Sequence, residues 1–229
     1  MGRENWYRRE TWTPEDQLDF FRRLDRTRSE SSKAGRCRVQ ALSLEKTGDP
    51  ERILAAVGLL RLVLKNWPDQ QFEMAGVHWG LAGCFEKLGR IHESLGSLRD
   101  SLAAQRAFPN VRNPAFLDFG WLAIRSNRPE LFEESIALLE EFGPADVDHG
   151  PPTERYCYAA ICAIVADRTG QSELAGPWAR RAMDAASAAI GNLWRHPTWI
   201  TSPFPPDAGI HERLQVLAVD SAGRTLRHE

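Results

Sequence analysis

The sequence predicts an all-α protein built as an array of antiparallel helical hairpins. Three observations lead to this prediction. Strand signals are nearly absent, helix starts are marked by capping residues, and one pattern of small and apolar residues recurs along most of the chain. A single hairpin cannot bury both of its faces, so we expect about four hairpins to stack, with one further helix capping each end.

Capping residues locate the helix starts. Thr13-Pro14 and Asp49-Pro50 each place an N-cap side chain before a proline at the first helical position, and Asn113-Pro114 repeats this order. Four glycines that follow apolar stretches are expected to end helices in the left-handed conformation: Gly48, Gly89, Gly143 and Gly170. These signals predict about ten helices, at residues 14–29, 33–47, 50–66, 70–88, 91–107, 114–126, 129–142, 153–169, 172–190 and 208–219.

A small residue on the first helix of each predicted hairpin defines the repeat. It stands at Ala41, Ala82, Gly120 and Ala163, with intervals of 41, 38 and 43 residues. The residue at the turn position comes seven residues later, at Gly48, Gly89, Asn127 and Gly170. The second helix of each hairpin carries residues at positions i, i+4 and i+7 that should face the first helix. These are Ala56/Leu60/Val63, Ser94/Leu98/Ser101, Phe132/Ile136/Leu139 and Ala175/Ala179/Ala182.

This pattern resembles the tetratricopeptide repeat family, and residues 75–109 match that family best, through Leu81-Ala82, Phe85 and Gly89-Arg90. The resemblance covers residues 33–190. It implies a right-handed α-solenoid, with a capping helix in residues 1–32 and an aromatic, proline-rich loop, capping helix and tail in residues 191–229. The spacing is nearer 40 residues than the family's ~34, which leaves another helical-hairpin array, such as a HEAT-like one, as the alternative.

Residues at helical spacing, mostly apolar, are expected to turn the two terminal helices toward the array. They are Leu18, Phe21, Leu24 and Arg28 in the first helix, with Phe20 beside them, and Ile210, Leu214 and Leu217 in the last. Such helices would cover apolar ends that an open array would otherwise expose to water.

Composition and charge argue against several classes of protein. The formal net charge is −2, which provides no general basic surface for nucleic acid or an anionic membrane. Residues 1–38 hold ten basic against seven acidic side chains, and residues 127–150 are acidic; we interpret both as solvated helix faces. No run approaches the roughly 20 apolar residues that cross a bilayer, and the first residues lack the apolar core of a secretory signal. We therefore expect a cytoplasmic protein.

The sequence contains no nucleophile elbow, phosphate-binding loop, dinucleotide fingerprint or zinc-protease motif. Four cysteines lie in apolar helical stretches, where we expect them to be buried thiols: Cys37, Cys84, Cys157 and Cys162. We accordingly predict no enzymatic activity, no cofactor and no bound metal.

The resemblance implies that the first helix of each hairpin lines a concave, partner-binding face. Counted on that basis, the predicted partner-binding residues are Arg38, Trp79, Glu86, Trp121, Arg125 and Arg168. Tryptophan and arginine are frequent anchors of protein interfaces, although the two tryptophans could instead fill the core. We predict a bacterial protein that binds another protein or a peptide segment, as an adaptor, an inhibitor or antitoxin, or a regulator.

Two stretches support the alternative of an enzyme or small-ligand sensor. The hairpin at 78–92 carries His78, Glu86 and His92, which could act as acids, bases or metal ligands. The loop at 194–199 carries Trp194, His196 and Trp199, and could be an aromatic plug, a contact patch or a gate. A cluster of histidines and carboxylates in a pocket would favour this alternative, whereas an exposed surface of tryptophan and arginine would favour protein binding.

Overall fold

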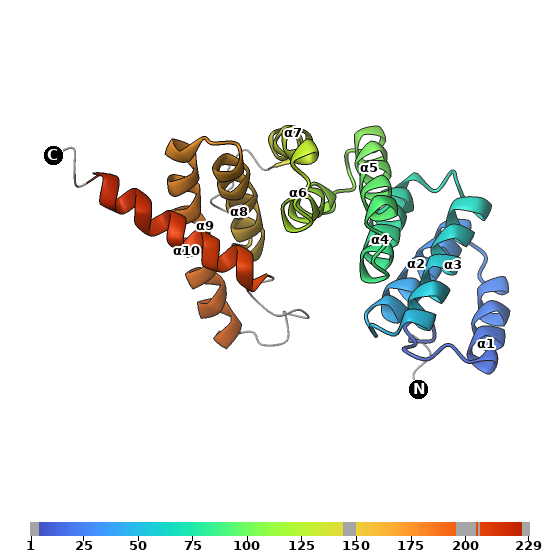
Figure 1. Cartoon of the computed structure of the whole chain (residues 1–229). Helices are drawn as coiled ribbons and strands as arrows, with labels where there is room; N and C mark the ends of the chain where they lie inside the picture. Colours follow the sequence, from blue (N-terminus) through green and yellow to red (C-terminus); the bar gives the residue numbers. More distant parts are fainter. Residues whose placement is uncertain (1–4, 144–149, 196–204, 206, 226–229) are drawn as a thin grey trace. The chain divides into compact units, whose positions relative to one another are not determined.

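The computed structural model describes residues 5–143, 150–195, 205 and 207–225, and within these residues the fold is entirely helical (Figure 1). The chain divides into two compact units, residues 1–115 and 116–229, which are described separately below. The helices are α1 (Pro14–Asp25), α2 (Glu30–Glu45), α3 (Pro50–Asn66), α4 (Gln71–Lys87), α5 (Ile91–Ala107), α6 (Ala115–Arg125), α7 (Phe132–Phe142), α8 (Pro152–Arg168), α9 (Ser172–Arg195) and α10 (Ala208–Thr225), with a short 3-10 helix, η1, at Pro129–Leu131.

All ten predicted helices are present, but several bounds differ: α9 and α10 extend five and six residues beyond their predicted ends, and residues 129–131 form η1 ahead of α7. The most informative difference is at the first connection. Helix α1 ends at Asp25, four residues earlier than predicted, and α2 begins at Glu30. The reason is a capping signal that the sequence analysis missed: the Ser29 side chain accepts a hydrogen bond from the Ser32 amide. Arg28 therefore lies in the connection rather than on α1.

The backbone conformation confirms the four turn positions that the repeat predicts. Among the described residues, four have φ in the left-handed region: Gly48 (72°), Gly89 (72°), Asn127 (51°) and Gly170 (78°). These are the four predicted turn positions, and asparagine is the residue that tolerates this conformation best after glycine. The prediction for Gly143 was wrong, because its φ of −61° and ψ of 150° are extended.

The first unit contains two hairpins, α2–α3 and α4–α5, whose facing residues are buried as the repeat predicts. Ala41, Ala56 and Leu60 are fully enclosed between α2 and α3. In the second hairpin the contact is polar, because the buried Ser94 hydroxyl donates to the Ala82 carbonyl oxygen at 2.9 Å. The facing residue at this repeat position is therefore small in both hairpins, Ala56 in the first and Ser94 in the second, but it can be apolar or polar.

The buried face of α1 includes the predicted Leu24 but is rotated away from the predicted Leu18 and Phe21. Phe20 and Leu24 are buried, with 0% and 4% of their surface exposed, whereas Leu18 and Phe21 are 72% and 37% exposed. The cause lies outside the helix: the rings of Trp6 and Trp12 pack on Phe20, at 5.4 and 5.3 Å between centroids. The segment before α1 is thus part of the core of the first unit.

In the second unit, α9 packs on α8 through alanines. Ala163 on α8 and Ala175, Ala179 and Ala182 on α9 are all buried, as predicted. The Ile161 side chain of α8 packs closely on Gly120 of α6, where an added Cβ would lie 2.9 Å from Ile161 Cδ1. Ile210, Leu214 and Leu217 of α10 are buried against this core, as expected for a terminal cap. No helix in the described part of the chain is long and apolar enough to cross a membrane.

Candidate functional site

The structure places Arg38, a predicted partner-binding residue, in a contact between two helices. Its Nε donates to Glu73 Oε2 at 2.6 Å, and Glu73 is buried, with 8% of its side chain exposed. The Arg38 side chain also covers Gly76, where an added Cβ would be 3.1 Å from Arg38 Cδ. Further along α2, Glu45 makes the same kind of contact, since its carboxylate pairs with Lys87 of α4 at 2.7 Å.

We call this arrangement the α2–α4 seam, formed by Arg38 and Glu45 of α2 and by Glu73, Gly76 and Lys87 of α4. Each basic side chain in it faces a carboxylate of the other helix. The seam joins neighbouring hairpins of the first unit. Arg38 therefore has a structural partner within the chain, and Trp79 and Glu86 lie half-buried further along α4.

The other three predicted residues belong to the second unit. Trp121 packs on the core there, with its ring 6.2 Å from that of Tyr156. Arg168 donates from Nη1 to the Ile124 carbonyl oxygen at 2.6 Å, and so caps the last turn of α6. Arg125 is exposed at the end of α6. The six predicted residues are thus divided between the two units, with Arg38, Trp79 and Glu86 in the first and Trp121, Arg125 and Arg168 in the second.

The two alternative sites gain no support from the described residues. His78 Nδ1 lies 3.7 Å from Asp100 Oδ2, and burial lowers the pKa of this histidine, while His92 is exposed. Within the described residues no group of three or more histidine, cysteine, aspartate or glutamate side chains could hold a metal ion. The side chains of the 194–199 loop lie outside the described residues.

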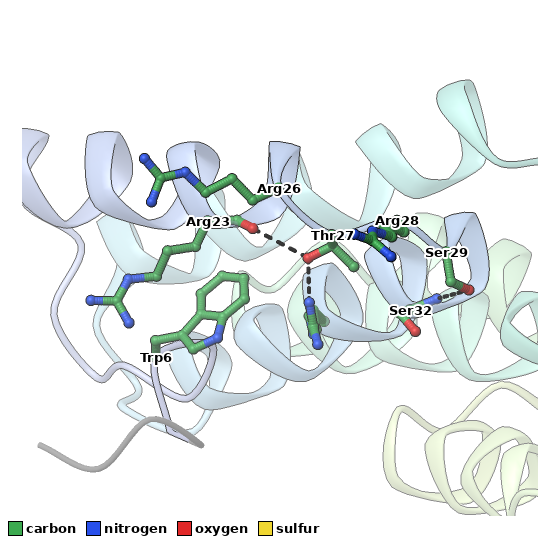
Figure 2. A pocket seen from close by; sticks show the side chains of 8 residues that line it. Trp6, Arg23, Arg26, Thr27, Arg28, Ser29 and Ser32 are labelled. Atoms are coloured by element: carbon green, nitrogen blue, oxygen red, sulfur yellow. Dashed lines mark hydrogen bonds between the residues drawn. The ribbon is translucent and has the colours of Figure 1, made fainter.

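A basic hollow in the first unit is the best candidate site. It has a volume of about 590 Å³ and combines one aromatic ring with arginines and hydroxyl groups. Its lining residues are Trp6, Arg23, Arg26, Thr27, Arg28, Ser29, Ser32 and Arg36, which we call the arginine cavity. In Figure 2, Thr27 lies at the centre, with Trp6 and Arg23 on one side and Ser29 and Ser32 on the other.

Four parts of the chain form the arginine cavity, and the segment before α1 supplies Trp6. The end of α1 supplies Arg23, the connection supplies residues 26–29, and the first turns of α2 supply Ser32 and Arg36. The Ser29 side chain caps the start of α2, which stabilises the junction at this residue. The connection between α1 and α2 thereby supplies half of the lining, residues 26–29.

Trp6 orders two of the arginines. The guanidinium carbons of Arg36 and Arg23 lie 5.3 and 6.0 Å from the centroid of its ring, within the range of a cation–π contact. Arg36 also donates to the Thr27 hydroxyl, which in turn donates to the Arg23 carbonyl oxygen at 3.2 Å. Arg36 is half-buried and held from two sides, so it offers a donor group in a fixed place.

Trp6 is itself anchored by a buried glutamine. The Gln40 side chain is fully enclosed and accepts from the Arg9 amide at 3.0 Å while donating to the Arg9 carbonyl oxygen at 2.7 Å. Arg9 then donates from Nε to the Trp6 carbonyl oxygen at 3.1 Å, and its other nitrogens pair with Asp16 and Asp19. This network ties the segment before α1 to the body of the first unit.

The charge of the arginine cavity is not balanced by the residues that line it. Four arginines and no carboxylate are found among its described lining residues. Glu30, the first residue of α2, is engaged elsewhere, by Lys33 Nζ at 2.8 Å and by the Trp67 indole. Asp19 pairs with Arg23 at 2.9 Å and balances that one charge, so the cavity is basic through Arg26, Arg28 and Arg36. An anion is the kind of ligand that this arrangement can bind.

The arginine cavity was not predicted from the sequence. The excess of basic residues in 1–38 is equally typical of a solvated helix face, which was the interpretation above. The signal was the combination of Trp6 with four arginines between positions 23 and 36. Only the folded chain shows that these side chains line one hollow.

Comparisons with protein-family models, with curated proteins and with solved structures find no match to this chain. The site is therefore interpreted from its own chemistry.

Proposed function

We propose that this protein is a non-enzymatic binding module, built from helical hairpins similar to tetratricopeptide repeats, that recognises an anionic segment of another protein. The observation that carries the proposal is the arginine cavity, in which four arginines and a tryptophan line one hollow and Asp19, from outside the lining, pairs with one of the arginines, Arg23. Arginine and tryptophan are the side chains most enriched among the energetically dominant residues of protein interfaces.

The form of the cavity supports a protein segment as the partner. A volume of about 590 Å³ accommodates a side chain and part of its flanking backbone. Trp6 supplies an apolar surface, whereas the guanidinium groups supply orientation and charge. Four residues outside the cavity are still predicted to make further contacts with this partner: Trp79, Trp121, Arg125 and Arg168.

Site-specific photo-crosslinking tests the proposal. A benzophenone amino acid placed at Ser32 of the full chain would be irradiated in cells that express the protein, and the attached peptide identified by mass spectrometry. We expect a segment of another protein that carries acidic or phosphorylated residues next to the attachment point. The double variant Arg26→Ala/Arg28→Ala should lose this product, whereas Arg112→Ala, at an exposed arginine outside the cavity, should keep it.

The outcome can contradict the proposal in two ways. A product formed equally well by the double variant would show that the cavity arginines do not hold the partner. Attachment to a nucleic acid or to a small molecule would replace protein binding with a different function.

A further inference from the structure

We propose that the arginine cavity recognises a phosphorylated serine or threonine in its partner. This inference rests on the proposed function, and it specifies the anionic group. The cavity offers more donors than a carboxylate can use. A phosphate monoester has three terminal oxygens and a charge of about −1.5 to −2 at pH 7, while a carboxylate has two oxygens and a charge of about −1.

The donors differ in how firmly they are held. Arg36 is fixed by Trp6 and Thr27, so it can serve as the first contact for a phosphate oxygen. Arg26 and Arg28 are exposed, so their side chains can turn toward a bound phosphate from the connection between α1 and α2. The forked guanidinium group fits two oxygens of one phosphate, which makes such contacts directional.

The first turn of α2 adds to the donor set. Ser29 and Ser32 both line the cavity, and the Ser29 oxygen is already oriented by its bond from the Ser32 amide. The Ser29 hydroxyl hydrogen can still be donated to a ligand. Helix α2 is 16 residues long, and its positive end borders the cavity, which favours a doubly negative group over a singly negative one.

The layout favours a phosphorylated protein over a nucleic acid. The four arginines surround a single hollow with one aromatic ring. Nucleic acids are usually bound by basic stripes that contact several phosphates in succession, and this chain has a formal net charge of −2. A single phosphate with a few flanking residues matches both the charge and the volume of the cavity.

The test compares three fluorescent peptide libraries that differ only at the central residue. Each has four randomised positions on either side of phosphoserine, glutamate or serine, and binding to the full chain is measured by anisotropy. We expect the phosphoserine library to bind about tenfold more tightly than the glutamate library, and the serine library to bind weakest. A single-stranded DNA of the same length serves as the nucleic-acid probe and should bind more weakly than phosphoserine.

Variants of the protein and a change of pH test whether the preference for phosphoserine arises in the arginine cavity. Arg26→Ala/Arg28→Ala should weaken phosphoserine binding by about tenfold or more, with helicity unchanged by circular dichroism, and Arg112→Ala should have no effect. Arg36→Lys, which keeps the charge but loses the fork, should bind phosphoserine less tightly than the wild type. Lowering the pH from 7 to 5 should weaken phosphoserine binding but not glutamate binding, because only the phosphate takes up a proton near pH 6.

Each of the other outcomes contradicts the phosphate inference, the proposed function or both. Equal binding of phosphoserine and glutamate, both lost in the double variant, would overturn the phosphate inference and leave the proposed function standing. Binding of none of the peptides would overturn both. Tighter binding of the DNA, also lost in the double variant, would assign the cavity to nucleic acid instead.

Discussion

The arginine cavity and the α2–α4 seam differ in what their arginines contact, although Arg36 and Arg38 are only two residues apart on α2. Arg38 meets the buried carboxylate of Glu73 at 2.6 Å. Arg36 meets a hydroxyl group and an aromatic ring. The first contact neutralises the charge of its arginine, and the second holds an arginine in place while leaving its charge uncompensated.

This difference separates a structural role from a binding role. A paired, buried charge contributes to stability mainly because breaking the pair leaves the other partner desolvated and alone. An ordered charge without a counter-charge is available to a ligand, and its removal costs the fold little. Variants in the seam should therefore change stability and leave binding intact, and variants in the cavity should do the reverse.

The largest expected effect is from Glu73→Gln in the seam. The substitution keeps the shape of the side chain but leaves Arg38 without its counter-charge, so we expect a loss of about 3 kcal/mol in the free energy of unfolding. Urea denaturation followed by circular dichroism measures this loss. Glu51→Gln, at an exposed position of α3, is the control and should change the free energy of unfolding by less than about 0.5 kcal/mol. A loss in Glu73→Gln no larger than in the control would show that the seam pair is not structural.

The next effect is from Gln40, a buried residue of α2 that anchors the segment before α1 through the Arg9 backbone. Gln40→Ala removes both hydrogen bonds to the Arg9 backbone, with an expected loss of about 2 kcal/mol in the free energy of unfolding. Because Trp6 depends on this anchor, phosphopeptide binding should weaken as well. Both quantities are measured on the same variant, by urea denaturation and by anisotropy. Unchanged binding in a destabilised variant would mean that the segment before α1 does not order the cavity.

A smaller effect is expected from the close approach of the helices in the seam. Gly76→Ala adds a Cβ that would lie 3.1 Å from Arg38 Cδ, so we expect a net loss of about 1 kcal/mol from overpacking. Gly58→Ala is the matched control, since Gly58 is an exposed position of α3 and a Cβ there would meet nothing within 4 Å. Alanine is the better helix former, so Gly58→Ala should gain about 0.5–1 kcal/mol. Thermal denaturation of the pair should shift the midpoints in opposite directions, and parallel shifts would contradict the packing argument.

The smallest effect is the acid sensitivity of the network beside the cavity. A hydrogen bond from Arg22, followed by the contact with Arg23, lowers the pKa of Asp19 from its ordinary 3.8 to about 2. A carboxyl group with a lowered pKa in the folded state stabilises the protein above its unfolded pKa, and this contribution is lost as the pH falls from about 4 toward 2. Asp19→Asn should reduce the decline of the urea midpoint over that interval. An identical decline in the variant would exclude Asp19 as its source.

Much of the fold could be predicted because the signals for it are local. Thr13 and Asp49 cap helices as expected, each through a side chain that accepts from a backbone amide three residues later. The turn positions were found by counting from a small residue, and even Asn127 adopts the conformation that glycine adopts in the other repeats. The failure at Gly143 has the opposite cause, since a glycine after a helix permits a left-handed conformation but does not require it.

The candidate site was harder to predict because its residues are recognisable only by their neighbours in space. Arg36, Arg38 and Arg168 look alike in the sequence, yet they contact an aromatic ring, a carboxylate and a carbonyl oxygen respectively. Similarly, helical spacing alone pointed to Leu18 and Phe21 as the buried face of α1, because the packing of Trp6 and Trp12 on Phe20 could not be seen.

The sequence by itself therefore determined the helices, their turns and the register in which the hairpins repeat. These features depend on capping, backbone conformation and side-chain size over a few neighbouring residues, so they can be read directly from the sequence. The tertiary structure alone decided which charges are paired and which remain to meet a ligand. Pairing joins residues far apart in the chain, as Arg38 and Glu73 show at a separation of 35 residues, and its energy depends on burial that only the packed helices create.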